Sequence, residues 1–179
     1  YSYSPLWDIQ VLSPSKKGEL GTVELNKKLQ EALNPAKDGI KDITVKGINL
    51  RIGDKVMQIK NNYDIPWVRD DGTEGEGVFN GDIGMLEVIK KAEDLVIVRY
   101  DDKKAYYTFE EAGDLELAYA VTVHKSQGSE FEAVIMPSYP GPERLYYRNL
   151  LYTAVTRAKK LFVMVGNPST MIKMIDNNR

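Results

Sequence analysis

Two short segments in the C-terminal third of the chain gather residue types that suit contact with phosphate. The first runs from Thr122 to Phe131 and reads TVHKSQGSEF, with a His, a Lys, two Ser and a Gln around one Gly. A glycine lets backbone N–H groups approach a phosphate without an intervening side chain. The second runs from Leu150 to Lys160, reads LLYTAVTRAKK and places Arg157 on a predicted helix. The planar guanidinium of Arg157 can grip two phosphate oxygens at once.

The composition sets limits on what these segments can do. The chain has 179 residues, of which 42% are hydrophobic and 28% charged, enough for one ordinary globular domain or two small ones. With no Cys and a single His, disulfides, zinc ribbons, thiol catalysis and multi-histidine metal sites are excluded. A net charge of -2 argues against general polyanion binding, so any nucleic-acid contact must be local. The sequence has neither an apolar run long enough to span a membrane nor a signal pattern, which predicts a soluble, cytoplasmic protein.

Hydrophobic spacing at the two ends of the chain is typical of an α/β domain. Apolar residues at helical spacing from Thr22 to Leu33 predict a helix that is capped by Thr22 and stopped by Pro35. The almost wholly apolar run from Leu161 to Gly166 is typical of a central parallel strand. The other expected strands are 7–12 and 133–137, and the other expected helices are 117–127, 146–160 and 169–175.

A β-rich segment interrupts this α/β pattern. From Leu50 onward, short runs such as GMLEVI and LVIVRYD are separated by turn signals, which predicts a small antiparallel barrel. The Gly-, Asp- and Glu-rich stretch from Asp70 to Gly81 is expected to be a flexible loop. We therefore expect one domain formed by residues 1–50 and 115–179, with the barrel inserted at 51–114.

The order and spacing of TVHKSQGSEF and LLYTAVTRAKK, with apolar strand-like runs between them, resemble motifs V and VI of superfamily 1 helicases. The resemblance is closest to the RecD-like branch and covers nearly the whole chain, because IQVLSP, KGELGTVELNKKLQ, GDKVMQIKNNYD and FNGDIG also look like segments of that family. It implies a RecA-like parallel-sheet domain of the P-loop NTPase type that lacks the P-loop. It also implies that an SH3-like antiparallel barrel interrupts this domain.

The resemblance assigns nucleotide-contacting roles. Arg157 matches the arginine that stabilises charge on the γ-phosphate of ATP across the seam between two lobes. Gly128 would face the γ-phosphate side, Glu130 would hydrogen-bond the ribose, and Gln127 and Ser129 would give polar support. The residues also admit simpler interpretations. Gly128 could merely end a helix, Glu130 could face water, and Arg157 could pair with a surface carboxylate.

The same resemblance assigns contacts with single-stranded DNA. Thr122, His124 and Lys125 match positions that contact the strand and couple it to the nucleotide state. For His124, a purely structural role is an equal alternative. Tyr152 and Thr156 are expected to pack and orient the helix that carries Arg157.

The barrel offers a second candidate surface for the strand. Lys60 and Asn61 lie in a stretch that interleaves cations, amides and aromatic residues, as single-strand grooves often do. The other members of this stretch are Lys55, Asn62, Tyr63 and Trp67. Packing is the favoured role for Trp67. The barrel could instead dock a protein partner.

No GxxxxGK[ST] phosphate loop occurs in the chain, and no acidic pair follows a strand to hold Mg²⁺. The chain also begins at Tyr1 rather than Met, so we expect a fragment that is inactive alone. Its partners would be single-stranded DNA, the N-terminal RecA-like lobe with the Mg²⁺ ligands, and repair-complex subunits.

The resemblance thus implies the C-terminal motor lobe of an ATP-dependent 5′–3′ DNA helicase, related to the exodeoxyribonuclease V alpha chain and acting in DNA repair or recombination. A lobe of a Dda-like helicase, or a noncatalytic module that binds single strands or docks proteins, is the alternative.

Overall fold

A computed structural model describes residues 2–178, which form two compact units. One unit contains the two ends of the chain, up to Leu29 and from Tyr119 onward, and the other contains Gln30–Ala118. The barrel range predicted from the sequence, 51–114, lies inside the second unit. Each unit is described by itself.

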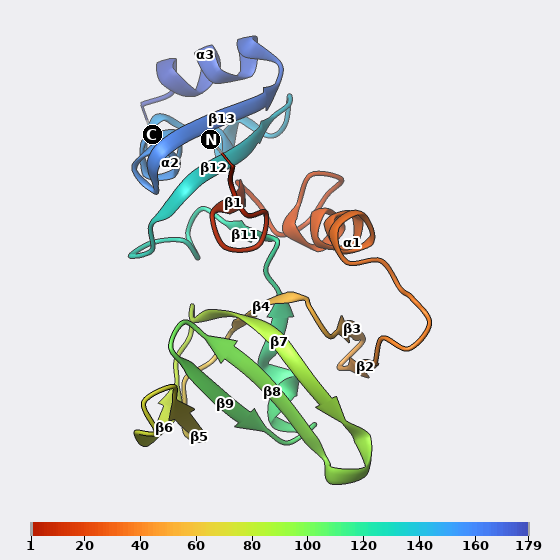
Figure 1. The fold of residues 1–179 in the computed structure, drawn as a ribbon. Coiled ribbons are helices and arrows are strands. Elements are labelled where there is room, and N and C mark those ends of the chain that lie inside the picture. The colour runs from red at the N-terminus through yellow and green to blue at the C-terminus, as the bar shows by residue number, and fades with distance from the viewer. Residues whose placement is uncertain (1, 179) are drawn as a thin grey trace. The chain divides into compact units, whose positions relative to one another are not determined.

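The first unit is built on a four-stranded sheet with the order β11-β1-β12-β13, in which every neighbouring pair is parallel. In Figure 1, β12 and β13 run side by side near the blue end of the colour scale. The strands predicted over 7–12, 133–137 and 161–166 are confirmed, with shifted ends, as β1 (Ile9–Ser13), β12 (Phe131–Ser138) and β13 (Ala158–Gly166). The fourth strand, β11 (Ala120–Thr122), was not predicted.

Three helices accompany these strands, namely α1 (Thr22–Leu33), α2 (Arg148–Thr156) and α3 (Pro168–Asp176). The predicted bounds of α1 are confirmed. The side chain of Asn26 on α1 donates to the carbonyl oxygen of Ala120 at 2.9 Å and accepts from its N–H at 2.8 Å. This pair of bonds satisfies the backbone N–H and C=O of Ala120 in β11, which ends the sheet among the described residues.

The helix predicted over 117–127 is wrong. The chain instead forms β10 (Leu115–Leu117), β11 and then a series of turns from Val123 to Gly128. Residues Tyr119 to Val121 and Val123 are buried, and β11 pairs with β1, so tertiary pairing outweighs the local helical spacing.

The helix predicted over 146–160 is too long. Helix α2 ends at Thr156, and β13 begins at Ala158, which pairs with Phe131. Arg157 is therefore the residue that follows the helix rather than part of it. Strand β13 ends the sheet among the described residues, and its side chains are mostly half-buried or exposed, so the prediction of a central strand is also wrong.

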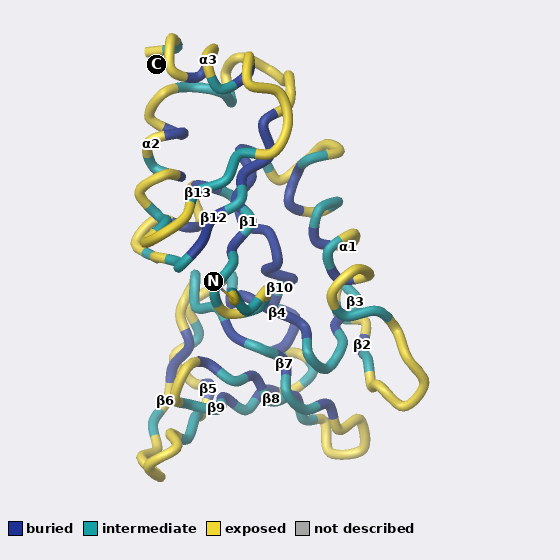
Figure 2. The backbone as a smooth tube through the Cα atoms, turned by 45° about the horizontal axis from the view of Figure 1, so that its top comes forward, coloured by how far each residue is buried: buried dark blue, intermediate teal, exposed yellow. Residues whose placement is uncertain are grey.

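The second unit contains a seven-stranded antiparallel sheet with the order β10-β4-β7-β8-β9-β5-β6, beside a two-stranded sheet. Strand β4 is buried along its whole length, as the dark blue tube shows (Figure 2). The further bounds are β2 Asp42–Val45, β3 Ile48–Arg51, β4 Lys55–Gln58, β5 Asn62–Arg69, β6 Glu74–Val78, β7 Ile83–Lys90, β8 Leu95–Tyr100 and β9 Lys103–Tyr107. Short 3₁₀ turns cover Lys91–Glu93, Glu111–Asp114 and, in the first unit, Glu143–Leu145.

The flexible loop predicted over Asp70–Gly81 is replaced by a hairpin. Strand β6 pairs with β5 after a tight turn in which Gly72 has a φ of +86°. Packing requires a glycine at position 75, because a Cβ there would lie 2.4 Å from the ring of Trp67. The acidic and glycine residues of this stretch thus form an edge strand that lies close against an indole.

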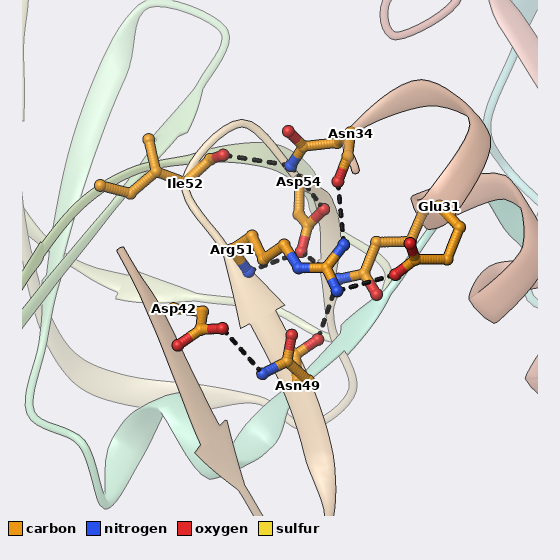
Figure 3. A network of polar contacts seen from close by, with 8 residues as sticks. Glu31, Asn34, Asp42, Asn49, Arg51, Ile52 and Asp54 are labelled. Carbon is orange, nitrogen blue, oxygen red and sulfur yellow. Dashed lines mark hydrogen bonds and ion pairs between the residues drawn. The ribbon is translucent and has the colours of Figure 1, made fainter. Parts of the chain in front are cut away.

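A buried polar network organises the start of the second unit (Figure 3). The carboxylate of Asp54 is fully buried and accepts hydrogen bonds from Gln30 Nε2 at 2.7 Å, Asn34 Nδ2 at 2.9 Å and the N–H of Arg51 at 2.7 Å. The guanidinium of Arg51 donates to the carbonyl of Asn34 and to the carboxylate of Glu31. The end of α1 is therefore tied to the turn between β3 and β4.

Candidate functional site

The segment Thr122–Glu130, which we call the 122–130 turn, connects β11 to β12. Its first part is held by local hydrogen bonds. The N–H of Lys125 donates to Thr122 Oγ1 at 3.2 Å, and the N–H of Ser126 donates to the carbonyl of Thr122 at 3.1 Å. Val123 anchors the turn to β1, because its N–H donates to the carbonyl of Ser13 at 3.0 Å.

Gly128 gives the 122–130 turn its shape. Its φ is +84°, a left-handed conformation that side chains disfavour, and no atom lies within 4 Å of a Cβ built on it. The surface at Gly128 is therefore open. The residues directly before Gly128 form turns rather than a helix, so the interpretation of Gly128 as a helix terminator is wrong.

Arg157 is tied to the end of the 122–130 turn at two points. Its carbonyl accepts from the N–H of Phe131 at 2.8 Å, and its Nη1 donates to the carbonyl of Ser129 at 3.1 Å. Its Nη2 also donates to Thr156 Oγ1 at 3.4 Å. Two segments that lie 28 residues apart in the sequence thus meet at one guanidinium.

The guanidinium of Arg157 keeps spare hydrogen-bonding capacity. It has five N–H donors, of which the contacts to Ser129 and Thr156 use two. Its Nε is buried and has no partner within the described part of the chain. No carboxylate pairs with Arg157 among residues 2–178, so a surface ion pair does not explain its position. Donors left over on a half-buried arginine suit an anionic ligand.

Most side chains of the 122–130 turn face solvent. His124, Lys125, Gln127 and Glu130 are exposed, and Thr122 is half-buried. Because His124 is exposed, it is not a buried structural histidine. Val123 and Ser126 are the exceptions within the turn, each being only 1% exposed.

The register of the sheet separates the two ends of the 122–130 turn. Val11 pairs with Ala120 on one side and with Ile135 on the other, so these two residues lie level across the sheet. Thr122 therefore lies about six residues further along the strand direction than Phe131, or about 20 Å. Thr122 is at the carboxyl edge of the sheet, whereas the contact between Arg157 and Ser129 is at the amino ends of β12 and β13.

Lys60 and Asn61 lie in the other compact unit and form a separate candidate surface. Lys60 Nζ is 3.5 Å from a carboxylate oxygen of Asp114, and Asn61 Oδ1 accepts from the N–H of Asn80 at 2.9 Å. Close by in sequence, Tyr63 and Phe79 form an edge-to-face pair with ring centroids 5.6 Å apart. Their exposed fractions of 67% and 43% leave both rings open to a ligand.

Phe79 is the residue at this surface that the sequence analysis missed. It lies outside the stretch that suggested a groove, and only the pairing of Asn62 on β5 with Val78 at the end of β6 brings it near Tyr63. An exposed aromatic residue next to a turn glycine is too common a pattern to have identified it.

Two other members of the predicted groove stretch are not available to a strand. Lys55 is 4% exposed, and burial lowers the pKa of its amine to about 8, so its proposed place in the groove is wrong. Trp67 packs against Gly75, and the cations of Arg69 and Lys103 lie 5.2 Å and 4.8 Å from its ring centroid. The packing role favoured for Trp67 is confirmed.

Tyr152 lies on α2, the helix that precedes Arg157. Tyr152 was expected to pack, but its 69% exposure makes that prediction wrong. Among residues 2–178 there is no group of three or more His, Asp or Glu side chains that could hold a metal ion. None of the helices in this part of the chain is long and apolar enough to cross a membrane.

Two family models match this chain. Residues 25–100 match the SH3 domain of ATP-dependent RecD-like DNA helicases, and residues 117–165 match the C-terminal domain of UvrD-like helicases. The ATP-dependent RecD2 DNA helicase of Deinococcus radiodurans is 36% identical over 161 residues, which cover 90% of this chain and 20% of that protein. The RecD subunit of the RecBCD enzyme of Buchnera aphidicola is 30% identical over 176 residues, which cover 94% of this chain and 26% of that subunit.

A solved structure shares the fold. The crystal structure of Pif1 helicase from Bacteroides in complex with ADP-AlF3 and single-stranded DNA superposes with a TM-score of 0.57 at 19% identity. The match covers 98% of this chain and 43% of that one. The chain therefore spans less than half of this helicase and about a quarter or less of the two sequence relatives.

Proposed function

Because this chain belongs to the RecD-like family of DNA helicases, we propose that it forms the C-terminal motor lobe of an ATP-dependent DNA helicase. The single observation that supports this best is the hydrogen bond from Arg157 to the carbonyl of Ser129, which joins the two motif-like segments at one open turn. Its phosphate loop and Mg²⁺ ligands would belong to an N-terminal RecA-like lobe of the same polypeptide.

Arg157 is the proposed catalytic residue. Phosphoryl transfer depends mostly on positioning and on cations that neutralise charge on the γ-phosphate oxygens. Arg157 is mounted at the end of α2 and held by Ser129, with donors to spare, so it is suited to meet the γ-phosphate of ATP bound on the other lobe. When bound, ATP supplies the phosphoryl group whose hydrolysis drives the motor.

The residues around Arg157 suit a nucleotide. Gly128 leaves the surface open and puts no side chain in the way of a phosphate, while Gln127 and Ser129 offer polar groups beside it. Glu130 is exposed at the end of the 122–130 turn, where its carboxylate can accept hydrogen bonds from ribose hydroxyls.

Single-stranded DNA is the proposed second ligand of this unit. Thr122, His124 and Lys125 lie toward the carboxyl edge of the sheet, away from Arg157, and offer a hydroxyl, an imidazole and an ammonium group for the phosphate backbone. We extend the proposal to 5′–3′ movement and to a role in DNA repair or recombination, because the motif-like segments follow the RecD-like pattern.

The barrel would hold the same strand. Asn61 bonds the N–H of Asn80, the residue after Phe79, and Lys60 precedes Asn61 in the chain and pairs with Asp114, so a cation, an amide and two exposed rings belong to one unit. Stacking on aromatic rings holds single-stranded bases without sequence preference. The open Tyr63–Phe79 pair is the observation that favours this role.

The proposal is tested by replacing Arg157 in the full-length polypeptide. Loss of an arginine that stabilises the transition state lowers the rate of ATP hydrolysis by about 10³-fold or more, so we expect this loss in Arg157→Ala. Arg157→Lys should not rescue it, because an ammonium cannot reproduce the planar fork. ATP turnover is measured together with single-strand affinity, which should be unchanged.

Lys159→Ala is the matched control, because Lys159 is an exposed cation two residues further along the chain. It should retain normal turnover. Near-normal turnover in Arg157→Ala, with the fold intact, would refute the proposed role.

A further inference from the structure

Strand β6 ends the seven-stranded sheet, and no other strand pairs with its outer side among residues 2–178. Opposed residues of antiparallel strands alternate between pairs that exchange backbone hydrogen bonds and pairs that do not. The N–H of Arg69 donates to the carbonyl of Thr73 at 2.8 Å, so these two residues form a bonded pair. The next pair, Val68 with Glu74, is therefore not bonded, and the N–H and C=O of Glu74 point away from β5.

The same alternation applies to Glu76, two residues further along β6. Its partner on β5 is Pro66, which has no N–H to donate, as a pair without backbone bonds allows. Glu74 and Glu76 are exposed, so two N–H and two C=O groups on the outer side of β6 are left for another chain. An open depression of about 570 Å³ lies here, lined by Pro66, Trp67, Val68, Glu74, Gly75 and Glu76.

The indole of Trp67 lies over one face of β6. Trp67 pairs with Gly75, and a Cβ on that glycine would overlap the ring. The cations of Arg69 and Lys103 lie 5.2 Å and 4.8 Å from the ring centroid. Because this face already carries two cations beside an aromatic ring, the position next to Gly75 suits an apolar side chain better than a third cation.

The opposite face of β6 is acidic. The side chains of Glu74 and Glu76 lie on this face, because successive residues of a strand point to opposite sides. Neither glutamate has an ion-pair partner in the part of the chain that the structure describes. The stretch 70–76 contains four acidic residues and no Lys or Arg. A strand added to β6 would gain from Lys or Arg beside these glutamates, since opposite charges on neighbouring strands attract.

We propose that the outer side of β6 binds an extended basic peptide of a partner protein by strand addition. Its Lys or Arg residues face Glu74 and Glu76, and an apolar residue between them lies beside Gly75 and the indole of Trp67. Backbone hydrogen bonds supply the affinity, and the alternating side chains supply the specificity. The site goes beyond the proposed function, because it takes neither nucleotide nor DNA.

Two other occupants fit this edge less well. A second copy of the chain, paired through the same strand, would bring glutamates beside glutamates. A nucleic-acid strand would place its phosphates against the same carboxylates. The Tyr63–Phe79 pair, proposed to hold single-stranded DNA, lies at the other end of the hairpin, where Asn62 pairs with Val78.

The test measures binding of a fluorescein-labelled KVKVK peptide to the full-length polypeptide by fluorescence anisotropy at constant salt. We expect a dissociation constant below about 1 mM. An EVEVE peptide should not bind. A KVKVK peptide with Nα-methylated lysines should not bind either, because it keeps its charge but loses the N–H groups that would donate to Glu74 and Glu76.

Two variants separate the backbone from the charges. Glu76→Pro removes an N–H that points outward and leaves the bonds between β5 and β6 intact, so the affinity should fall about 10-fold or more. Glu74→Lys/Glu76→Lys keeps every N–H and reverses both charges, so the affinity should fall about 5-fold or more. This double variant tests the site even if Glu76→Pro does not fold.

Asp38→Lys/Glu110→Lys is the matched control, because it changes the net charge equally at exposed acids of the same unit outside β6. It should bind KVKVK as the wild type does. The inference is overturned by absent binding, by unchanged affinity in the folded β6 variants, by an equal loss in the control, or by normal binding of the methylated peptide. If Glu76→Pro weakens oligo(dT) binding but not peptide binding, the edge belongs to DNA instead.

Discussion

The carboxylate of Asp54 and the guanidinium of Arg157 are both charged groups in polar clusters at the end of a strand or helix, but they differ in how fully each group is paired. Both oxygens of Asp54 accept hydrogen bonds, and the carboxylate is fully buried. Arg157 has an unpartnered Nε and further unused donors beside an exposed turn. An unpartnered Nε is not specific to Arg157, because Arg51 Nε in the Asp54 network also lacks a partner. Arg157 differs because Arg51 is paired with the carboxylate of Glu31, whereas Arg157 has no carboxylate partner among residues 2–178 and lies beside the open turn at Gly128.

The largest effect on stability is expected at Asp54. Asp54→Asn keeps the side-chain volume but replaces one acceptor oxygen by an amide donor that faces Gln30, Asn34 or the N–H of Arg51. Loss of charge-assisted bonds and an unsatisfied donor should lower the free energy of unfolding by about 4 kcal/mol. Urea unfolding of the 179-residue chain measures this.

Asp38→Asn is the control for that substitution, because Asp38 is exposed and should change stability by less than about 0.5 kcal/mol. Equal effects at the two aspartates would show that the Asp54 network is not what holds this part of the unit together.

The buried amine of Lys55, which also belongs to the second unit, gives a prediction that depends on pH. Burial lowers the pKa of its amine from 10.5 to about 8. The unfolded chain therefore binds the proton of Lys55 more tightly than the folded chain does, and folding costs free energy at any pH where the unfolded chain carries that proton. The cost is complete below pH 8, about 3 kcal/mol, and it disappears as the pH rises from 8 to 10.5. Lys55→Met should therefore stabilise the chain at pH 7 by up to that amount.

The difference in unfolding free energy between Lys55→Met and the wild type should shrink between pH 7 and pH 9.5. Taking the difference cancels the titration of tyrosines that both proteins share. A gain that does not vary with pH would contradict a cost that arises from burying the charge.

The smallest effect is expected on the barrel surface. Tyr63→Ala removes one ring of the exposed pair with Phe79, and stacking of one base contributes about 1–3 kcal/mol. Single-strand affinity of the full-length polypeptide should therefore fall about 5- to 100-fold, while the stability of the chain changes little. Fluorescence anisotropy with a labelled oligo(dT) measures the affinity.

Tyr152→Ala is the control for that substitution, because Tyr152 is a similarly exposed tyrosine on α2. If both variants bind the strand as tightly as the wild type, the barrel surface has no part in binding, and a protein-docking role gains support.

Sequence patterns predicted the parts of the fold that depend on local chemistry. The bounds of α1 follow from helical spacing between Thr22 and Pro35, and the strands within GMLEVI and LVIVRYD follow from the turn residues that flank them. The β5–β6 hairpin was not predicted, because its glycines and acidic residues resemble a loop. The errors arise where pairing between segments distant in the sequence decides the secondary structure. β11 is a strand because β1 lies beside it, and α2 stops early because Ala158 pairs with Phe131.

The candidate site was predictable as a set of residues but not as a geometry. The motif-like segments identified Arg157 and Gly128, yet the bond to Ser129 depends on the register of β12 and β13. The burial of Ser126 was not visible either, because nothing in the sequence separates a buried serine from an exposed one. Burial of Lys55 was missed for the same reason.

The central claim is that Arg157 completes a nucleotide site whose other half lies elsewhere in the polypeptide. It is tested most directly by a crystal structure of the full-length polypeptide with ADP, Mg²⁺ and aluminium fluoride, which mimics the γ-phosphate in transfer. We predict that a guanidinium nitrogen of Arg157 lies about 3 Å from a fluorine atom, within hydrogen-bonding range. A guanidinium that remains bonded only to Ser129 and Thr156, well beyond that range, would contradict the account.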